Sequence, residues 1–488
     1  MKRRLKTIAL VAAATLLLGA LAAAAVRFID VERYRPRFES AIHDATGLDC
    51  SLGHLSLSLW PFPNLRADHP TLGHAGRTIL KAERLTLSVR LLPLLDRRLE
   101  LRALTLTRAS GTIRRDKEGR LNLLPTRKKE RPAMAGPFSG LRIAEIVLDN
   151  ADLRYEDAAT GFFVAAREMD LALGPFTFVE KGKASGNPFA GAWQGHLAAK
   201  AIRTKNLTLD RPSVSFAAQN RSLTLQPVSA TVHGGKLTAA VTVNDFPGPN
   251  PQWSSTCTID GLDLASLSTA LRHRNRLTGR LQVNTGLTTS GTGRAALLRR
   301  LNGNVAMHGQ ELTIDGIDLD TVLSHYAKSQ ELDLFDLGSI FLVGPFGPLL
   351  GKAFDLTGSA LGVGRGKSRI TRLASEWSVA NGVAAAQDVA LATPQHRLAA
   401  RGRLDLAAER FRDFRVALVD RRGCATVTQT IGGTFRHPEV GKADFLTRAI
   451  VNPILSLFRK GAATLNGKPA GCATPFYQGS IPHPAGKP

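Results

Sequence analysis

Two glycine-containing stretches have spacing close to that of nucleotide-binding loops. Residues 362–368 read GVGRGKS, but a phosphate-cradling P-loop also needs a glycine five positions before the one in Gly-Lys-Ser. Leu361 stands there, so the turn around the phosphates cannot close. Gly291 and Gly293, followed by Ala296, imitate part of a dinucleotide fingerprint. Alternating strand patterns flank them, whereas the fingerprint requires a βαβ unit. The sequence therefore predicts no nucleotide cofactor.

Histidines and serines in this chain do not form the patterns of an enzyme. The twelve histidines include no H-E-x-x-H pair and no other paired metal-ligand spacing. Isolated residues such as His43 and His437 are most often surface or packing residues. A Gly-x-Ser-x-Gly nucleophile elbow between a strand and a helix is also missing. We therefore expect a protein that is not an enzyme, with no catalytic residue, metal or cofactor.

Composition favours a folded, basic protein. The chain has 488 residues, 43% of them hydrophobic and 6% aromatic, and a net charge of +24. The excess of arginine and lysine has two readings, a solvated basic surface or attraction to anionic lipid headgroups. Nucleic acid is disfavoured as a partner, because the basic residues are scattered and recognition motifs are missing.

The N-terminal segment is typical of a membrane anchor. Residues 8–26, from Ile8 to Val26, carry no charge and would span about 28 Å as a helix, close to the hydrocarbon thickness of a bilayer. Residues 1–6 are basic, which keeps the N-terminus cytoplasmic and exports the body. A cleaved signal peptide is the alternative, since residues 22–25 are alanines; the length of the apolar run favours an uncleaved anchor.

The body alternates apolar and polar residues with a period of two. Residues 31–46 predict a short amphipathic helix, and residues 263–272, 318–328 and 445–460 predict three more. Between them, runs such as LSLSL put leucines on one face of a strand and Ser or Thr on the other. This pattern favours antiparallel sheet with one solvated face. The apolar positions predicted to line that face are Leu55, Leu57, Leu59, Leu85, Leu87, Val89, Leu104, Leu106, Leu237, Val241 and Val243.

One stretch is more specific than alternation. Residues 287–323 contain a glycine, a short Leu-rich helix ending in Leu-x-Gly, a strand, and a Gly-Ile-Asp-Leu step into another helix. This arrangement resembles the C-terminal signature of the AsmA family. The N-terminal region agrees at Tyr34-Arg-Pro36 and at residues 55–63, LSLSLWPFP. The tail agrees at residues 472–479, CATPFYQG.

The resemblance implies a mainly β fold of the β-rich α+β type. An N-terminal transmembrane helix would be followed by an elongated, curved antiparallel β-sheet groove with a few short helices. We expect a cytoplasmic stub and anchor at residues 1–27, two β-groove regions at 28–260 and 261–440, and a C-terminal helix and tail at 441–488.

The same resemblance implies a single-pass inner-membrane protein with a periplasmic body. Such a protein would handle lipids, phospholipid above all, and support outer-membrane assembly. The alternative is an envelope scaffold that binds outer-membrane assembly components without carrying lipid. The two readings differ in whether the apolar face is covered by a second layer or left open, which the pattern alone does not decide. The sequence gives no oligomeric state.

The four cysteines of the chain predict one disulfide and two free thiols. Export places the body in an oxidising compartment, where disulfides persist. Cys424 and Cys472 both lie in the C-terminal strand and tail region, and we predict that they form a disulfide. Cys50 and Cys257 are then expected to be free, partly buried thiols.

Overall fold

The computed structural model describes residues 31–122, 140–326, 366–445 and 472–484, except for 59–61, 75, 97, 181–182, 185–190, 206, 247, 272–276, 317, 442–443 and 473. Most described residues lie in β-strands, and the helices are few and short. The chain divides into an N-terminal unit, Met1–Val228, and a C-terminal unit, Ser229–Pro488. The boundary falls within β16 (Ser222–Val232), earlier in the chain than the expected boundary after residue 260.

A helical entry segment precedes the first strands. The 3-10 helix η1 (Val31–Tyr34) leads into α2 (Arg35–Thr46), as the pattern of residues 31–46 predicts. The helix ends at Gly47, whose φ of 71° is left-handed and whose N–H donates to the His43 carbonyl. Glu39 accepts a 2.7 Å hydrogen bond from the Leu52 N–H, and Glu32 accepts one of 2.8 Å from Leu55. These carboxylates fix the helices to the edge of the sheet.

Among its described residues, the N-terminal unit contains fifteen strands and part of β16, with one further 3-10 helix, η2 (Leu92–Asp96). Its strands are β1 (Asp49–Ser51), β2 (Leu55–Ser58), β3 (Asn64–Asp68), β4 (Thr71–His74), β5 (Arg77–Lys81), β6 (Arg84–Arg90), β7 (Arg98–Thr107), β8 (Ser110–Arg115), β9 (Gly140–Ile143), β10 (Ile146–Asp157), β11 (Phe162–Gly174), β12 (Phe176–Glu180), β13 (Lys183–Ala184), β14 (Trp193–Arg203) and β15 (Thr208–Gln219).

Pairing in this unit is mostly antiparallel. One path runs β2–β3–β6–β7–β10–β11–β14–β15, and a second runs β1–β4–β5–β8–β10. The pairings of β10 with β7 and β8, and of β7 with β9, are parallel. The sheet is antiparallel, as expected from the sequence, except at these three pairings. Because strand β10 adjoins both β7 and β8, the two paths meet in one sheet.

The two paths meet where the strands bend. The bend residues Arg108, Asn150, Glu168 and Arg211 have positive φ values of 46–54°, uncommon for residues with a side chain. The register of β10 on β11 shifts on both sides of Ala151, which marks a β-bulge, and a bulged strand bends. β10 thus has two arms joined at a bulge.

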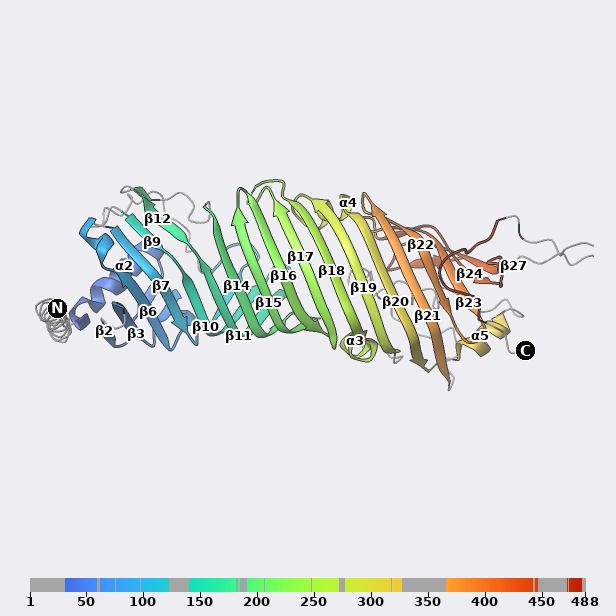
Figure 1. Ribbon diagram of the computed structural model, residues 1–488, viewed down its shortest axis with the longest axis horizontal. Helices are drawn as coiled ribbons and strands as arrows, with labels where there is room; N and C mark the ends of the chain where they lie inside the picture. Colours follow the sequence, from blue (N-terminus) through green and yellow to red (C-terminus); the bar gives the residue numbers. More distant parts are fainter. Residues whose placement is uncertain are drawn as a thin grey trace, which may run out of the picture. The chain divides into compact units, whose positions relative to one another are not determined.

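The C-terminal unit is an antiparallel meander from β17 to β25 (Figure 1). In the part of this unit that the structure describes, three short helices lie between the strands, and α3 and α5 fall within the predicted ranges 263–272 and 318–328. The predicted helix 445–460 lies almost wholly outside the described residues, and Phe445 ends a strand. The elements are β17 (Gly235–Asn244), β18 (Gln252–Asp263), α3 (Leu264–Leu271), β19 (Leu277–Ser290), α4 (Arg294–Arg299), β20 (Asn302–Asp315), α5 (Leu319–Tyr326), β21 (Lys367–Ala380), β22 (Val383–Ala392), β23 (Arg397–Asp405), β24 (Arg410–Val419), β25 (Ala425–Gly433), β26 (Pro438–Val440) and β27 (Asp444–Phe445).

The last strands of the C-terminal unit form a closed core. Trp377 on β21 stacks on Phe414 of β24, with ring centroids 6.3 Å apart, and both side chains are 1% exposed. Leu391 and Leu398, which pair across β22 and β23 on the same face, are 0% exposed. This block has the burial of an ordinary packed domain core.

The C-terminal tail covers the other face of the same strands. Alanines on β21–β24 form one cluster with Tyr477 and Ile481 of the tail. The Arg397 guanidinium donates to the Ile481 carbonyl at 2.8 Å and to the Asp420 carbonyl at 2.6 Å. A disulfide joins Cys424, just before β25, to Cys472 in the tail, with Cα atoms 5.8 Å apart. This is the pairing expected from the sequence, and Cys50 and Cys257 are free.

The predicted membrane anchor, residues 8–26, lies outside the described residues. In the part of the chain that the structure describes, no helix is long and apolar enough to cross a membrane.

The disulfide should stabilise the C-terminal unit by constraining the unfolded chain. Its two cysteines are 48 residues apart, and in the chain-entropy model a loop of that length contributes about 4 kcal/mol. We expect the double variant Cys424→Ala/Cys472→Ala to lose up to that much stability in denaturant unfolding followed by tryptophan fluorescence, because Trp377 lies in this core. The control variant Cys50→Ala/Cys257→Ala, which breaks no bridge, should stay much closer to the parent. Equal losses in both variants would contradict a stabilising bridge.

Candidate functional site

Two ladders of apolar side chains cross the N-terminal unit from β2 to β15. Residues that pair across strands lie on the same face of a sheet, so the register defines each ladder. The first ladder runs Leu55, Ala67, Leu85, Leu106, Leu148, Leu171, Leu197 and Val214. The second runs Leu57, Leu65, Leu87, Leu104, Ile146, Leu173, Gly195 and Phe216.

Polar residues dominate the row between the two ladders, which lies on the opposite face. That row runs Ser56, Arg66, Thr86, Thr105, Val147, Ala172, His196 and Ser215. The sheet thus separates an apolar face from a solvated one over eight strands. We call the first the apolar face.

The glycine in the second ladder makes room for an aromatic ring. A Cβ on Gly195 would lie 2.5 Å from the Phe216 ring and 2.3 Å from the Ala172 carbonyl oxygen. Phe216 therefore lies across the backbone of β14, with its ring 6.0 Å from that of Trp193. The Phe216 ring thus supplies the apolar surface at Gly195, where the second ladder has no side chain.

Most of the apolar face is half-buried, not covered. Every residue of the second ladder has intermediate exposure, and in the first ladder Leu55 and Ala67 alone are fully buried. Leucines beneath a second packed layer are ordinarily almost fully buried, as Leu391 and Leu398 are in the C-terminal unit. The described residues therefore leave this face accessible along its length.

Small side chains line the bend beneath the apolar face. Ala82, Ala109, Ala151, Met169 and Ala199 form one buried cluster there. Leu106 and Leu148 pack on it from one arm of the bent strands, and Leu80, Leu153 and Ile202 pack on it from the other. Apolar side chains of both arms thus pack on one buried cluster at the bend.

The apolar face of the C-terminal unit changes from half-buried to buried along the strand order. Leu237, Ile259 and Val283, which pair in sequence across β17, β18 and β19, have intermediate exposure. The next residues in that row, Met307 on β20 and Ser375 on β21, are 1% and 0% exposed. The accessible face therefore ends at the closed core.

The residues predicted from the sequence lie where alternation places them. Leu57, Leu85, Leu87, Leu104 and Leu106 belong to the ladders and are half-buried, and Leu55 is 3% exposed. Val89 is half-buried at the end of β6, Leu237 and Val241 are half-buried on β17, and Val243 there is 1% exposed. Leu59 lies outside the described residues. The prediction omitted Leu148, Leu171, Leu173 and Leu197, which only the pairing of β10, β11 and β14 brings into the ladders.

Both free cysteines lie on the apolar side of their strands. Cys50 pairs with Leu72, and Cys257 lies between Ala239 and Thr285. Burial raises the pKa of both thiols, and the nearby Glu39 carboxylate adds to the effect at Cys50. The thiols therefore stay protonated and are weak nucleophiles. Among the described residues, no group of three His, Cys, Asp or Glu side chains could hold a metal ion.

Comparison with known families gives one match. The model of the AsmA family matches residues 1–177 and 177–389 of this chain. No curated protein and no solved structure matches.

A charge on the apolar face should cost less stability than a charge in the closed core. In Leu87→Asp the new carboxylate lies between Leu65 and Leu104 but can still reach water, so we expect a loss of about 1–3 kcal/mol. In Leu398→Asp it would be buried without a partner, which costs several kcal/mol and prevents folding.

Thr86→Asp is the matched control, because it places the same charge on the solvated face beside Arg66 and should change stability by less than about 0.5 kcal/mol. Denaturant unfolding of the three variants makes the comparison. If Leu87→Asp fails to fold as Leu398→Asp does, the apolar face is covered in the folded protein.

Proposed function

The chain belongs to the AsmA family, and we propose that it binds lipid, with acyl chains along the apolar face of the N-terminal unit. The observation that carries the proposal is the pair of half-buried ladders across eight strands. Aliphatic side chains in continuous rows offer no hydrogen-bonding group, so they favour hydrocarbon and give little specificity for a headgroup.

The dimensions of the apolar face suit acyl chains. Eight adjacent strands are separated by seven spacings of about 4.8 Å, which gives a path of about 34 Å. Each methylene moved from water onto such a surface contributes up to about 0.8 kcal/mol. A lipid can therefore gain substantial binding energy there while its headgroup stays in water.

We further propose that residues 8–26 anchor the protein in the inner membrane and that its body lies in the periplasm. It takes up phospholipid, passes it toward the outer membrane, and so supports outer-membrane assembly without a catalytic step. Family membership and the basic, apolar N-terminus support this placement. The competing function is a scaffold that binds outer-membrane assembly components and carries no lipid.

Mass spectrometry of copurified lipid separates the two functions. We expect the full chain, purified from membranes, to retain phospholipid, and the variants Leu87→Asp and Leu171→Asp to fold but lose most of it. Charge in the middle of either ladder repels hydrocarbon. Thr86→Asp and Ala172→Asp, on the opposite face of the same strands, are the controls and should keep their lipid. Folded apolar-face variants that retain lipid at the parent level would favour the scaffold.

The anchor gives a separate prediction. An uncleaved helix at residues 8–26 should keep the full-length protein in the membrane fraction after carbonate extraction, because its 19-residue apolar run has no charge to draw it into water. N-terminal mass spectrometry of the extracted protein checks the same point. A mature protein that begins near Val26 would show that the segment is a cleaved signal peptide.

A further inference from the structure

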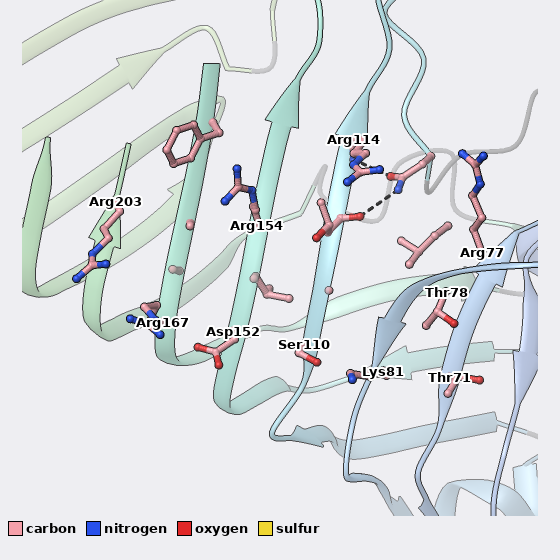
Figure 2. A pocket seen from close by; sticks show the side chains of 18 of the residues that line it. Thr71, Arg77, Thr78, Lys81, Ser110, Arg114, Asp152, Arg154, Arg167 and Arg203 are labelled. Carbon is pink, nitrogen blue, oxygen red and sulfur yellow. Dashed lines mark hydrogen bonds between the residues drawn. The ribbon is translucent and has the colours of Figure 1, made fainter. Parts of the chain in front are cut away.

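A second concave surface lies on the solvated side of the N-terminal unit, on the arm of the strands that carries β5, β8 and the second half of β10 (Figure 2). Its volume is about 1350 Å³. Arg154, Arg167 and Arg203 line it and alternate along β10, β11 and β14 with Leu153, Ala166 and Ile202, which pack on the buried cluster at the bend; Leu153 and Ala166 also border the hollow. Neighbouring residues of a strand point to opposite faces, so these cationic side chains point away from the apolar cluster. We call this concave surface the basic hollow.

Six cationic side chains line the basic hollow, namely Arg77, Lys81, Arg114, Arg154, Arg167 and Arg203. They come from five strands, and Figure 2 shows them around the hollow. Asp152 is the one acidic residue in its lining, and its carboxylate already accepts a hydrogen bond from the Glu168 N–H at 3.0 Å. The lining therefore carries a strong positive excess.

Two of the arginines share one neutralising partner. Glu156 accepts a hydrogen bond of 2.6 Å from Arg154 and one of 2.9 Å from Arg114. The hydrogen bond from Arg154, and then the one from Arg114, hold the pKa of the Glu156 carboxyl below its usual range. Within the described part of the chain, no carboxylate lies within ion-pair distance of Arg77, Lys81, Arg167 or Arg203. Four cations of the hollow are thus left without an acidic partner.

Register places an alanine between two of the guanidinium groups. Ala165 on β11 pairs with Arg154 of β10 on one side and with Arg203 of β14 on the other. The two arginines are thus two strand spacings apart, about 9.6 Å at the backbone, and the methyl group between them leaves the space above it open. Two long side chains from flanking strands can converge there on one anion. Phe163, whose ring lies 4.6 Å from the Arg154 guanidinium carbon, supports that side chain from beside the hollow.

We propose that the basic hollow binds a compact ligand that carries two or more phosphate groups. Guanidinium groups form paired, charge-assisted hydrogen bonds with phosphate oxygens, and five of the six cations are arginines. The cations come from five strands and do not form one row along a strand, which suits a compact polyanion better than an extended acidic peptide. The phosphates can belong to a lipid headgroup at a membrane surface or to a free phosphate compound. The site is independent of acyl-chain binding, because it lies on the opposite face of the sheet.

Binding measurements on the full chain test the site. The probes are tripolyphosphate, followed by calorimetry, and phosphatidylcholine vesicles that contain cardiolipin, whose headgroup carries two phosphates, followed by flotation. The variant Arg167→Gln/Arg203→Gln removes two cations of the hollow, and neither has an ion-pair partner among the described residues. We expect its affinity to fall at least about tenfold, because hydrogen bonds to a charged group are lost, with an unchanged unfolding temperature.

The control variant Arg66→Gln/Arg142→Gln removes the same charge from the same unit outside the hollow and should bind within about twofold of the parent. Loss of tripolyphosphate binding in the hollow variant supports a free phosphate ligand, and loss confined to the vesicles supports a lipid headgroup. The proposal is overturned if neither probe binds, if both variants lose affinity equally, or if an oligoglutamate peptide binds more tightly than tripolyphosphate. Copurified lipid should be unchanged in the hollow variant, which separates this result from the test of the apolar face.

Discussion

Two reciprocal hydrogen bonds between β10 and β11 fix the register on which the rest of the N-terminal unit depends. The N–H of Asn150, at the bulge of β10, donates to the Asp170 carboxylate on β11 at 2.9 Å. The N–H of Glu168, at the bend of β11, donates to Asp152 on β10 at 3.0 Å. Each strand thus satisfies the N–H group that its neighbour's irregular backbone would leave without a partner. A slip of one residue would break both bonds and move every leucine of β11 to the solvated face.

Because the register is fixed at the bend, side chains of one chemical type follow one another from strand to strand on each face of the sheet. On one side leucine meets leucine from strand to strand, and apolar residues of both arms pack on the alanine-rich cluster at the bend. On the other side the same register aligns Arg154, Ala165 and Arg203 in one row. The apolar face and the basic hollow are therefore two consequences of one set of strand pairings.

Alternation in the sequence predicts several of the strands and the common face of their leucines. Leu85, Leu87, Leu104 and Leu106 lie as their spacing predicts, since a period of two has one structural meaning in a half-buried strand. The partners of those strands were not predictable. β7 pairs in parallel with β10 after a long excursion of the chain, and local spacing carries no information about such non-local pairing.

The closed core and the basic hollow could not be predicted from the sequence, for similar reasons. Trp377 and Phe414 are far apart in the chain, and neither has a local pattern that distinguishes a stacked pair from two exposed rings. The arginines of the hollow come from separate strands and appear in the sequence as scattered charge. Only the register shows that Ala165 separates two of them. The disulfide, by contrast, was predictable. The chain has four cysteines, and Cys424 and Cys472 are the two that lie in the C-terminal strand and tail region.

The N-terminal unit and the last strands of the C-terminal unit treat apolar surface in opposite ways, and the difference bears on function. In the C-terminal unit, side chains on one face of the last strands close over Trp377, and the tail with Tyr477 and Ile481 covers the other face. In the N-terminal unit the described residues leave two rows of aliphatic side chains half-buried. A contiguous apolar surface of this kind in water favours association or aggregation, and the fold retains it across eight strands. In the function proposed above, hydrocarbon along the ladders removes that penalty without a second protein layer.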